Sequence, residues 1–144
     1  MLKRHSYNQP LPPNKYNPLA WVVPEAEIGD NCWIGAFCYV AGRVTLGDNV
    51  SLSNGVQVYD HDTSYYRATH GKVEKKYYHV TIEHDVQIGA NSVVIPQGKD
   101  IVIGHNSIVG ALSLVTESIP PYSVAVGIPA RVVKRINPED VAND

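Results

Sequence analysis

The sequence predicts an all-β repeat protein built from short strands that are joined by regular turns. Branched or long apolar residues occupy every sixth position from Val22 to Val58, a spacing that neither a helix (period about 3.6) nor a half-buried strand (period about 2) produces. The chain also carries 20 Val and 11 Ile against 7 Leu, which favours strands. Gly, Asp and Asn recur early in the repeats, and they tolerate the backbone angles of tight corners.

The length and charge of the chain limit its organisation and its partners. At 144 residues with 44% apolar side chains, we expect one domain. The net charge of -2 provides no general basic field, so we expect no nucleic-acid partner. The positive N-terminus has no apolar run behind it, and no stretch of about 18 apolar residues occurs. We therefore expect a cytoplasmic protein without membrane insertion.

The chain divides into three parts. Residues 1–21 are proline-rich and predict an extended arm, because proline disfavours a helix. Residues 22–136 form the repeat domain, which is interrupted by a looped-out segment at 59–81 and shifts by three residues at Pro96–Gly98. Residues 137–144 are a tail that begins Asn-Pro-Glu-Asp, the pattern of a helix start, so we expect a short C-terminal helix.

The two cysteines, Cys32 and Cys38, stand at the fifth position of successive repeats, where Val44, Val50 and Val56 follow. We interpret them as small core residues. Successive repeats on different faces of a coil would hold the two thiols apart, so no disulfide is expected.

The looped-out segment is the first candidate for function, since a loop of more than twenty residues is unusual in a compact repeat protein. Its charged centre, residues 72–76, is typical of a solvated loop tip. At its base, His61 stands between Asp60 and Asp62. Imidazole changes its protonation state near neutral pH and is a common general base.

Together these features resemble the hexapeptide-repeat acyltransferases. The resemblance rests on the six-residue period, the looped-out segment with a histidine at its base, the phrase IGANSVVIP at 88–96 and the ending IPPYSVAVGIPAR at 119–131. It covers roughly residues 22–136. It implies a left-handed parallel β-helix that assembles as a homotrimer with active sites between subunits.

The resemblance further implies an acetyl-CoA-dependent acetyltransferase in which His61 is the catalytic base. Asp60 and Asp62 either orient this ring or hold the acceptor, or they are local caps of the turn. Neither a Gly-x-Ser-x-Gly motif nor a cysteine with a nearby partner occurs, which favours direct attack of the acceptor on the thioester without an acyl-enzyme.

Similar proteins bind coenzyme A through small residues of the later coils and through basic residues of the C-terminal phrase. The matching positions are Ala90, Ala111, Thr116, Arg131 and Lys134. A pantetheine slot needs small side chains and a phosphate needs a cation. Glu117 departs from the pattern, because sugar-acetylating relatives often carry a lysine there.

The acceptor is implied to be a sugar or a sugar nucleotide. In the maltose and galactoside branch an Asn and an Asp contact the sugar, but the matching places fall near Trp33 and Ala41. The loop instead offers Arg67, which suits a phosphate, and tyrosines whose faces suit a sugar ring or a neighbouring subunit: Tyr65, Tyr66, Tyr77 and Tyr78.

Two alternatives remain open at the level of sequence. A γ-type carbonic anhydrase is built on a similar helix and binds zinc with three histidines across a trimer interface, and the spacing of His79 and His84 together with His61 resembles that set. We expect no metal, because the repeat places His84 in a solvent-facing turn. The other alternative is a non-catalytic β-helix scaffold.

Overall fold

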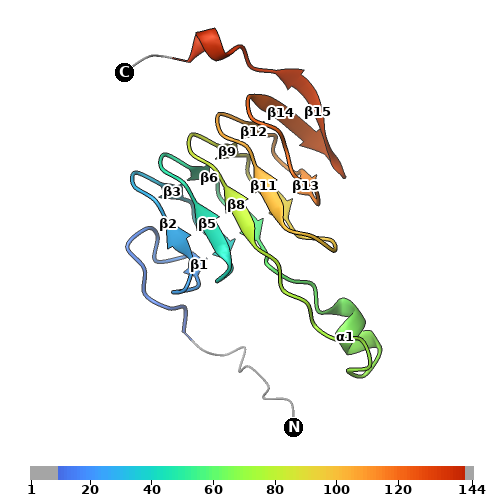
Figure 1. Ribbon diagram of the computed structural model, residues 1–144. Coiled ribbons are helices and arrows are strands. Elements are labelled where there is room, and N and C mark those ends of the chain that lie inside the picture. The colour runs from blue at the N-terminus through green and yellow to red at the C-terminus, as the bar shows by residue number, and fades with distance from the viewer. Residues whose placement is uncertain (1–9, 142–144) are drawn as a thin grey trace.

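The computed structural model describes residues 10–141 and shows a stack of coils, each made of short strands joined by corners (Figure 1). The strands of successive coils pair in parallel and form three sheets along the stack. An antiparallel pair, β14 with β15, ends the third sheet. The architecture is therefore the parallel β-helix that the sequence predicts.

Apart from the antiparallel β15, neighbouring strands of each sheet come from successive coils. Sheet A contains β1 (Trp21–Val22), β4 (Tyr39–Val40), β7 (Gln57–Val58), β10 (Val93–Val94) and β13 (Leu114–Val115). Sheet B contains β2 (Glu27–Ile28), β5 (Val44–Leu46), β8 (Val80–Ile82) and β11 (Ile101–Ile103). Sheet C contains β3 (Trp33–Ile34), β6 (Ser51–Leu52), β9 (Gln87–Ile88), β12 (Ile108–Val109), β14 (Ser123–Gly127) and β15 (Ala130–Arg135).

The strand register shows how six residues become one side of a coil. Trp21 pairs with Tyr39, 18 positions later, so three six-residue repeats complete one turn. Val80 pairs with Ile101, 21 positions later, which locates the predicted three-residue shift in the intervening corner. The period predicted from the sequence is thus the length of one side of the coil.

The periodic apolar residues fill the interior. Most positions that define the period are at most 6% exposed: Val22, Ile34, Val40, Leu46, Leu52 and Val58. Ile28 is half-buried against the core. After the loop the same holds at Ile82, Ile88, Val94, Ile103, Val109 and Val115. Burying each such side chain contributes roughly 1.5–3 kcal/mol, so the row supplies most of the driving force for coiling.

The corners follow the expected turn chemistry at one edge and depart from it at another. Asn31, Asn49, Asp85 and Asn106 adopt positive φ between sheets B and C, where Asn and Asp tolerate that conformation. Between sheets C and A, the positive-φ positions include Phe37 and Leu112, which the sequence does not mark as turn formers. The backbone hydrogen bonds between coils hold these two residues in place, from Phe37 N to Leu19 O and from Leu112 N to Ala90 O.

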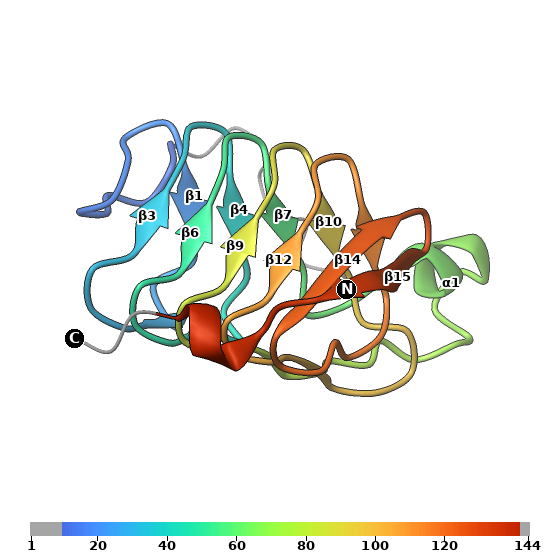
Figure 2. The ribbon, with the colours of Figure 1, turned by 90° about the horizontal axis from the view of Figure 1, so that it is seen from above.

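The looped-out segment leaves the stack after β7 and returns at β8 (Figures 1 and 2). Both views show it projecting outside the coils with a short helix, α1 (Ser64–Ala68), which the sequence analysis does not predict. Because β8 already begins at Val80, the excursion ends within the predicted range 59–81. His61 and Tyr77 form a bridge across its base, so both ends of the loop are tied together.

The ends of the stack are covered by the two terminal segments. Of the predicted arm, residues 1–9 lie outside the described part, and residues 10–20 contain no helix and place Ala20 in the core. At the other end, β14 and β15 form a hairpin that the sequence analysis treats only as a phrase. The predicted C-terminal helix is a 3₁₀ turn, η1 (Pro138–Asp140), capped by Asn137; residues 142–144 of the predicted tail 137–144 lie outside the described part.

Candidate active site

The candidate site is built around Asp60, a buried carboxylate that follows strand β7 of sheet A. Asp60 is 6% exposed, and its Oδ2 accepts a hydrogen bond from the backbone N–H of Arg43 at 3.2 Å. Its backbone carbonyl accepts from Tyr78 N at 2.8 Å. A buried carboxylate needs such partners. The coil therefore holds the side chain of Asp60, and the returning end of the loop holds its backbone.

The free oxygen of the same carboxylate holds His61. Asp60 Oδ1 lies 2.5 Å from His61 Nδ1. A carboxylate accepts hydrogen bonds, so Nδ1 donates this one and the lone pair of the neutral ring is left on Nε2. The His61 side chain is 27% exposed, enough for a reactant to reach it. The arrangement is that of an oriented general base.

Two residues pack around this pair: Arg43, which no sequence pattern marks, and Tyr77, which the sequence suggests only as a surface for a sugar ring or a neighbouring subunit. The Tyr77 ring contacts both residues of interest. Its centroid lies 4.9 Å from that of the His61 ring and 5.0 Å from the guanidinium carbon of Arg43. Arg43 thus contributes its backbone to Asp60 and its side chain to Tyr77. Arg43 lies about one coil before Asp60, so only the coil length could have identified it from the sequence. Tyr77 lies at the other end of the loop, so only the pairing of the loop ends could have identified it.

Asp62 has a different role from Asp60. Its Oδ1 accepts hydrogen bonds from the Ser64 hydroxyl at 2.5 Å and from Ser64 N at 2.8 Å. The Ser64 hydroxyl, followed by its N–H, holds the pKa of the Asp62 carboxyl below its usual range. This is the local cap that the sequence analysis gives as one alternative. Arg67, the other predicted acceptor residue, lies exposed in the last turn of α1.

Three of the five predicted coenzyme A residues lie near one corner. Ala90 O accepts from Leu112 N, which stacks Ala90 against Ala111 in the next coil. A Cβ on Gly89 would lie 2.4 Å from Ala111 N, so only glycine permits this close approach. Arg131 pairs with Val126, whose side chain lies beside Gly110. Small residues and one cation therefore meet between sheets C and A.

The other two lie elsewhere. Thr116 follows β13, at the opposite edge of sheet A from Ala111, and is buried. Lys134 pairs with Val124, toward the far end of β15 from Arg131, and is exposed. A single chain does not bring these two to the alanine corner.

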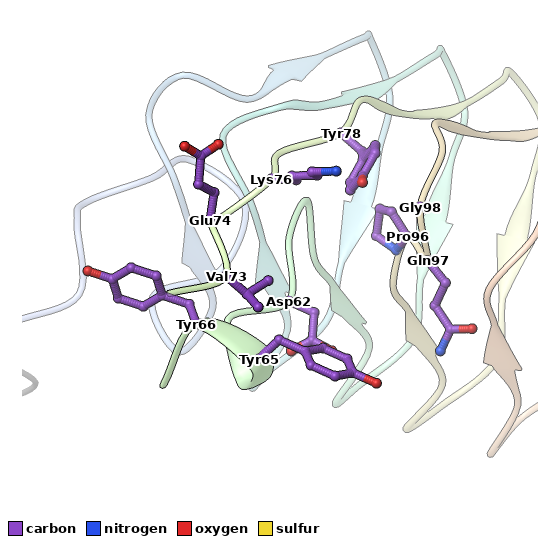
Figure 3. Close-up of a pocket in the computed structure, with 10 residues that line it drawn as sticks. All are labelled: Asp62, Tyr65, Tyr66, Val73, Glu74, Lys76, Tyr78, Pro96, Gln97 and Gly98. Atoms are coloured by element: carbon purple, nitrogen blue, oxygen red, sulfur yellow. The ribbon is translucent and has the colours of Figure 1, made fainter. Parts of the chain in front are cut away.

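A cavity of about 470 Å³ lies beside the loop (Figure 3). Its walls come from two segments, residues 62–78 of the loop and the corner at Pro96–Gly98. Asp62 and three of the four predicted loop tyrosines line it, whereas Tyr77 and His61 do not. The tyrosines thus divide between the cavity and the base of the loop.

The histidines of the zinc alternative are separated in the described chain. His84 is exposed, bonds Asp85 through Nδ1 at 2.7 Å and stacks on His105 with 4.9 Å between centroids. Within residues 10–141, no three His, Cys, Asp or Glu side chains of one chain gather into a metal-binding group. His84 is therefore engaged in a surface stack, at the solvent-facing turn where the repeat places it.

The cysteines behave as core residues, as predicted. Both are free; Cys38 is buried and Cys32 is half-buried. Burial raises the pKa of each thiol above its ordinary value. Neither is thus activated as a nucleophile.

The positions that match the acceptor residues of the galactoside branch differ in exposure: Ala41 is buried, and Trp33 is 65% exposed.

Comparison with known proteins gives matches over both halves of the repeat. Residues 25–60 match the family model described as bacterial transferase hexapeptide (six repeats), and residues 79–117 match the hexapeptide repeat of succinyl-transferase. The intervening residues are those of the loop.

Among described residues, no helix has the length and apolar character needed to cross a bilayer.

Relatives of this chain include galactoside O-acetyltransferases and a hexapeptide-repeat-containing acetyltransferase. The galactoside O-acetyltransferase of Escherichia coli is 35% identical over 84% of this chain and 63% of its own length. The galactoside O-acetyltransferase of Lactococcus lactis is 36% identical over 71% of this chain and 45% of its own length. The chain thus spans less than two thirds of these relatives. A hexapeptide-repeat-containing acetyltransferase from Vibrio cholerae superposes with a TM-score of 0.69, at 28% identity over 81% of this chain and 70% of that one. These matches confirm the predicted left-handed parallel β-helix.

Proposed function

Because the chain belongs to the hexapeptide-repeat acetyltransferase family, we propose that it transfers the acetyl group of acetyl-CoA to a hydroxyl or amino group of a sugar or sugar nucleotide. The observation that carries the proposal is the buried Asp60 with its 2.5 Å contact to His61 Nδ1. This contact leaves the lone pair of His61 Nε2 free to accept a proton, at the partly exposed point where the loop leaves the coil. The galactoside O-acetyltransferase relatives support the acceptor class.

The reaction proceeds by direct attack. The acceptor oxygen or nitrogen bonds to the thioester carbonyl carbon while His61 Nε2 takes its proton, and backbone N–H groups of a coil corner stabilise the oxyanion. The intermediate collapses by breaking the carbon–sulfur bond. The imidazolium then returns the proton to the departing thiolate of coenzyme A, which restores the neutral ring.

Acetyl-CoA lies along the corner between sheets C and A. Ala90 and Ala111 leave room for the pantetheine arm, and Arg131 supplies a cation for a phosphate. Thr116 and Lys134 lie away from this corner in one chain and contact the cofactor from a second subunit. Burial raises the pKa of both thiols and so disfavours them as nucleophiles, which supports direct transfer without an acyl-enzyme.

The protein assembles as a homotrimer that forms the site between neighbouring subunits. Large apolar side chains on and near the corner between sheets C and A support this assembly: Trp21, Trp33, Phe37 and Leu112 are 45–69% exposed. Exposed apolar groups of this size favour burial against another copy. A monomeric mass by light scattering would contradict the shared site.

The activity is tested by the release of coenzyme A thiol from acetyl-CoA in the presence of galactosides, amino sugars and nucleotide-linked sugars. We expect release that depends on one class of acceptor and that yields an acetylated sugar by mass spectrometry. Release with none of them would favour the non-catalytic scaffold.

A further inference from the structure

The cavity beside the loop forms where the two irregularities of the repeat meet. One wall comes from the long insertion between β7 and β8, and the other from the corner at Pro96–Gly98, which makes its coil 21 residues long in place of the regular 18. Insertions into a repeat array need no core position and collect on one face, which is often the binding face. Two independent insertions therefore enclose one space.

The size and the lining of the cavity suit a small polar ring. At about 470 Å³ it lies within the range of small-molecule sites, roughly 300–1,000 Å³. Val73, Pro96 and the face of Tyr78 supply apolar surface, while the Lys76 side chain extends toward Tyr78 (Figure 3). Pyranose rings present both C–H faces and hydroxyl groups, and tyrosine offers an apolar face with a polar end.

Asp62 provides a fixed charged group in the wall. Both described hydrogen bonds from Ser64 end on its Oδ1, which holds this carboxylate of the cavity lining in one orientation. A carboxyl of this kind is ionised at neutral pH, and the hydrogen bonds from Ser64 lower its pKa further. Hydrogen bonds to an ionised acceptor are about twice as strong as neutral ones.

The charges of the lining disfavour an anionic ligand. Lys76 is the cation among the lining residues, against the two carboxylates of Asp62 and Glu74. A phosphate or carboxylate would meet net negative charge here. A neutral or amino-substituted sugar meets acceptors in the carboxylates and donors in Lys76 and the tyrosine hydroxyls.

We propose that this cavity is the subsite that holds the pyranose ring of the acceptor. The proposal rests on the proposed function for the identity of the reaction, but the cavity can be tested by binding alone. Its wall begins at Asp62, which directly follows His61 in the sequence, while His61 itself lies outside the lining. Selectivity for the acceptor then resides in Asp62, Lys76 and Tyr78.

The binding test uses ligand-observed saturation-transfer NMR on the full chain without acetyl-CoA. The probes are methyl β-galactopyranoside, methyl 2-amino-2-deoxyglucopyranoside and glucose 6-phosphate. We expect the first two to bind and the phosphate to bind at least tenfold more weakly. Asp62→Asn and Lys76→Met should weaken binding about tenfold, with the loss in Asp62→Asn larger for the amino sugar. Lys72→Met, a change in the same charged segment outside the cavity, should leave it unchanged.

Binding of none of the sugars, or equal binding by all three variants and the unmodified chain, would overturn the proposal. Thiol release separates this failure from failure of the proposed function. If a sugar is acetylated and the Asp62 and Lys76 variants keep its KM, the cavity proposal is wrong and the acetyltransferase stands. If sugars bind in the cavity and no acetyl group is transferred, the pyranose site stands without the reaction. Unchanged circular dichroism of each variant shows that these results report binding.

Discussion

Asp60 Oδ1 and His61 Nδ1 lie 2.5 Å apart at the point where the chain leaves sheet A. The carboxylate is buried and its second oxygen accepts from the backbone of Arg43, so the coil fixes one side of the pair. The loop fixes the other side through Tyr77 and Tyr78. A local pair of adjacent residues thus becomes rigid through contacts far apart in the sequence.

The contact between these residues predicts the effect of Asp60→Asn. An amide keeps the shape of the side chain but removes the charge that orients and stabilises the protonated ring, so kcat should fall about 10–100-fold. The KM for acetyl-CoA should stay within about twofold, because Asp60 lies outside the corner proposed for the cofactor. Steady-state thiol release measures both constants.

The chain contains a matched control for this change. His84 and Asp85 are also neighbours joined through Nδ1, at 2.7 Å, but both are exposed on another corner. Asp85→Asn should therefore leave kcat unchanged. An equal loss in Asp60→Asn and Asp85→Asn would show that the first effect is not specific to His61.

The ring of Tyr77 should position His61 without taking part in the chemistry. Tyr77→Ala removes the contact between the rings and the cation–π contact with Arg43, and an aromatic pair is worth about 0.5–1.5 kcal/mol. We expect kcat to fall about three- to tenfold, with Tyr77→Phe close to the unmodified enzyme because the ring remains. A Phe variant as slow as the Ala variant would assign the function to the hydroxyl instead.

The buried thiols predict a specific alkaline sensitivity. Burial raises the pKa of Cys38, so the unfolded chain loses this proton at lower pH than the folded chain. The contribution of the neutral thiol to stability is therefore complete below the ordinary thiol pKa and falls as the pH rises above it. Urea unfolding from pH 7 to 10 should show a decline that Cys38→Ala reduces. A decline of the same size in Cys38→Ala would contradict this cause.

The sequence predicted the coils and their core because every coil repeats one local geometry. At Val40, Leu52 and Ile88, the same inward position recurs at a fixed spacing, so the periodic pattern alone identifies buried residues. The three-residue shift at Pro96–Gly98 also followed from the pattern. Such features depend on the sequence within one coil and on its neighbours at a constant interval.

The remaining features depend on contacts without a fixed interval. Helix α1 has five residues and no buried side chain, so no apolar pattern marks it. Tyr77 reaches His61 only because the ends of the loop pair, and Arg43 reaches Tyr77 and Asp60 from the preceding coil. The distribution of predicted cofactor residues between two edges, with Thr116 away from Ala111, likewise depends on which sheet each strand joins.

The most direct test of the account is the turnover of His61→Ala. General-base catalysis contributes about 10²–10⁴-fold, so kcat for thiol release with the best acceptor should fall by that factor. Circular dichroism and light scattering should show the fold and assembly of the unmodified protein, and His84→Ala should retain full activity. Near-normal turnover in His61→Ala would contradict the central claim that the Asp60–His61 pair is the catalytic base.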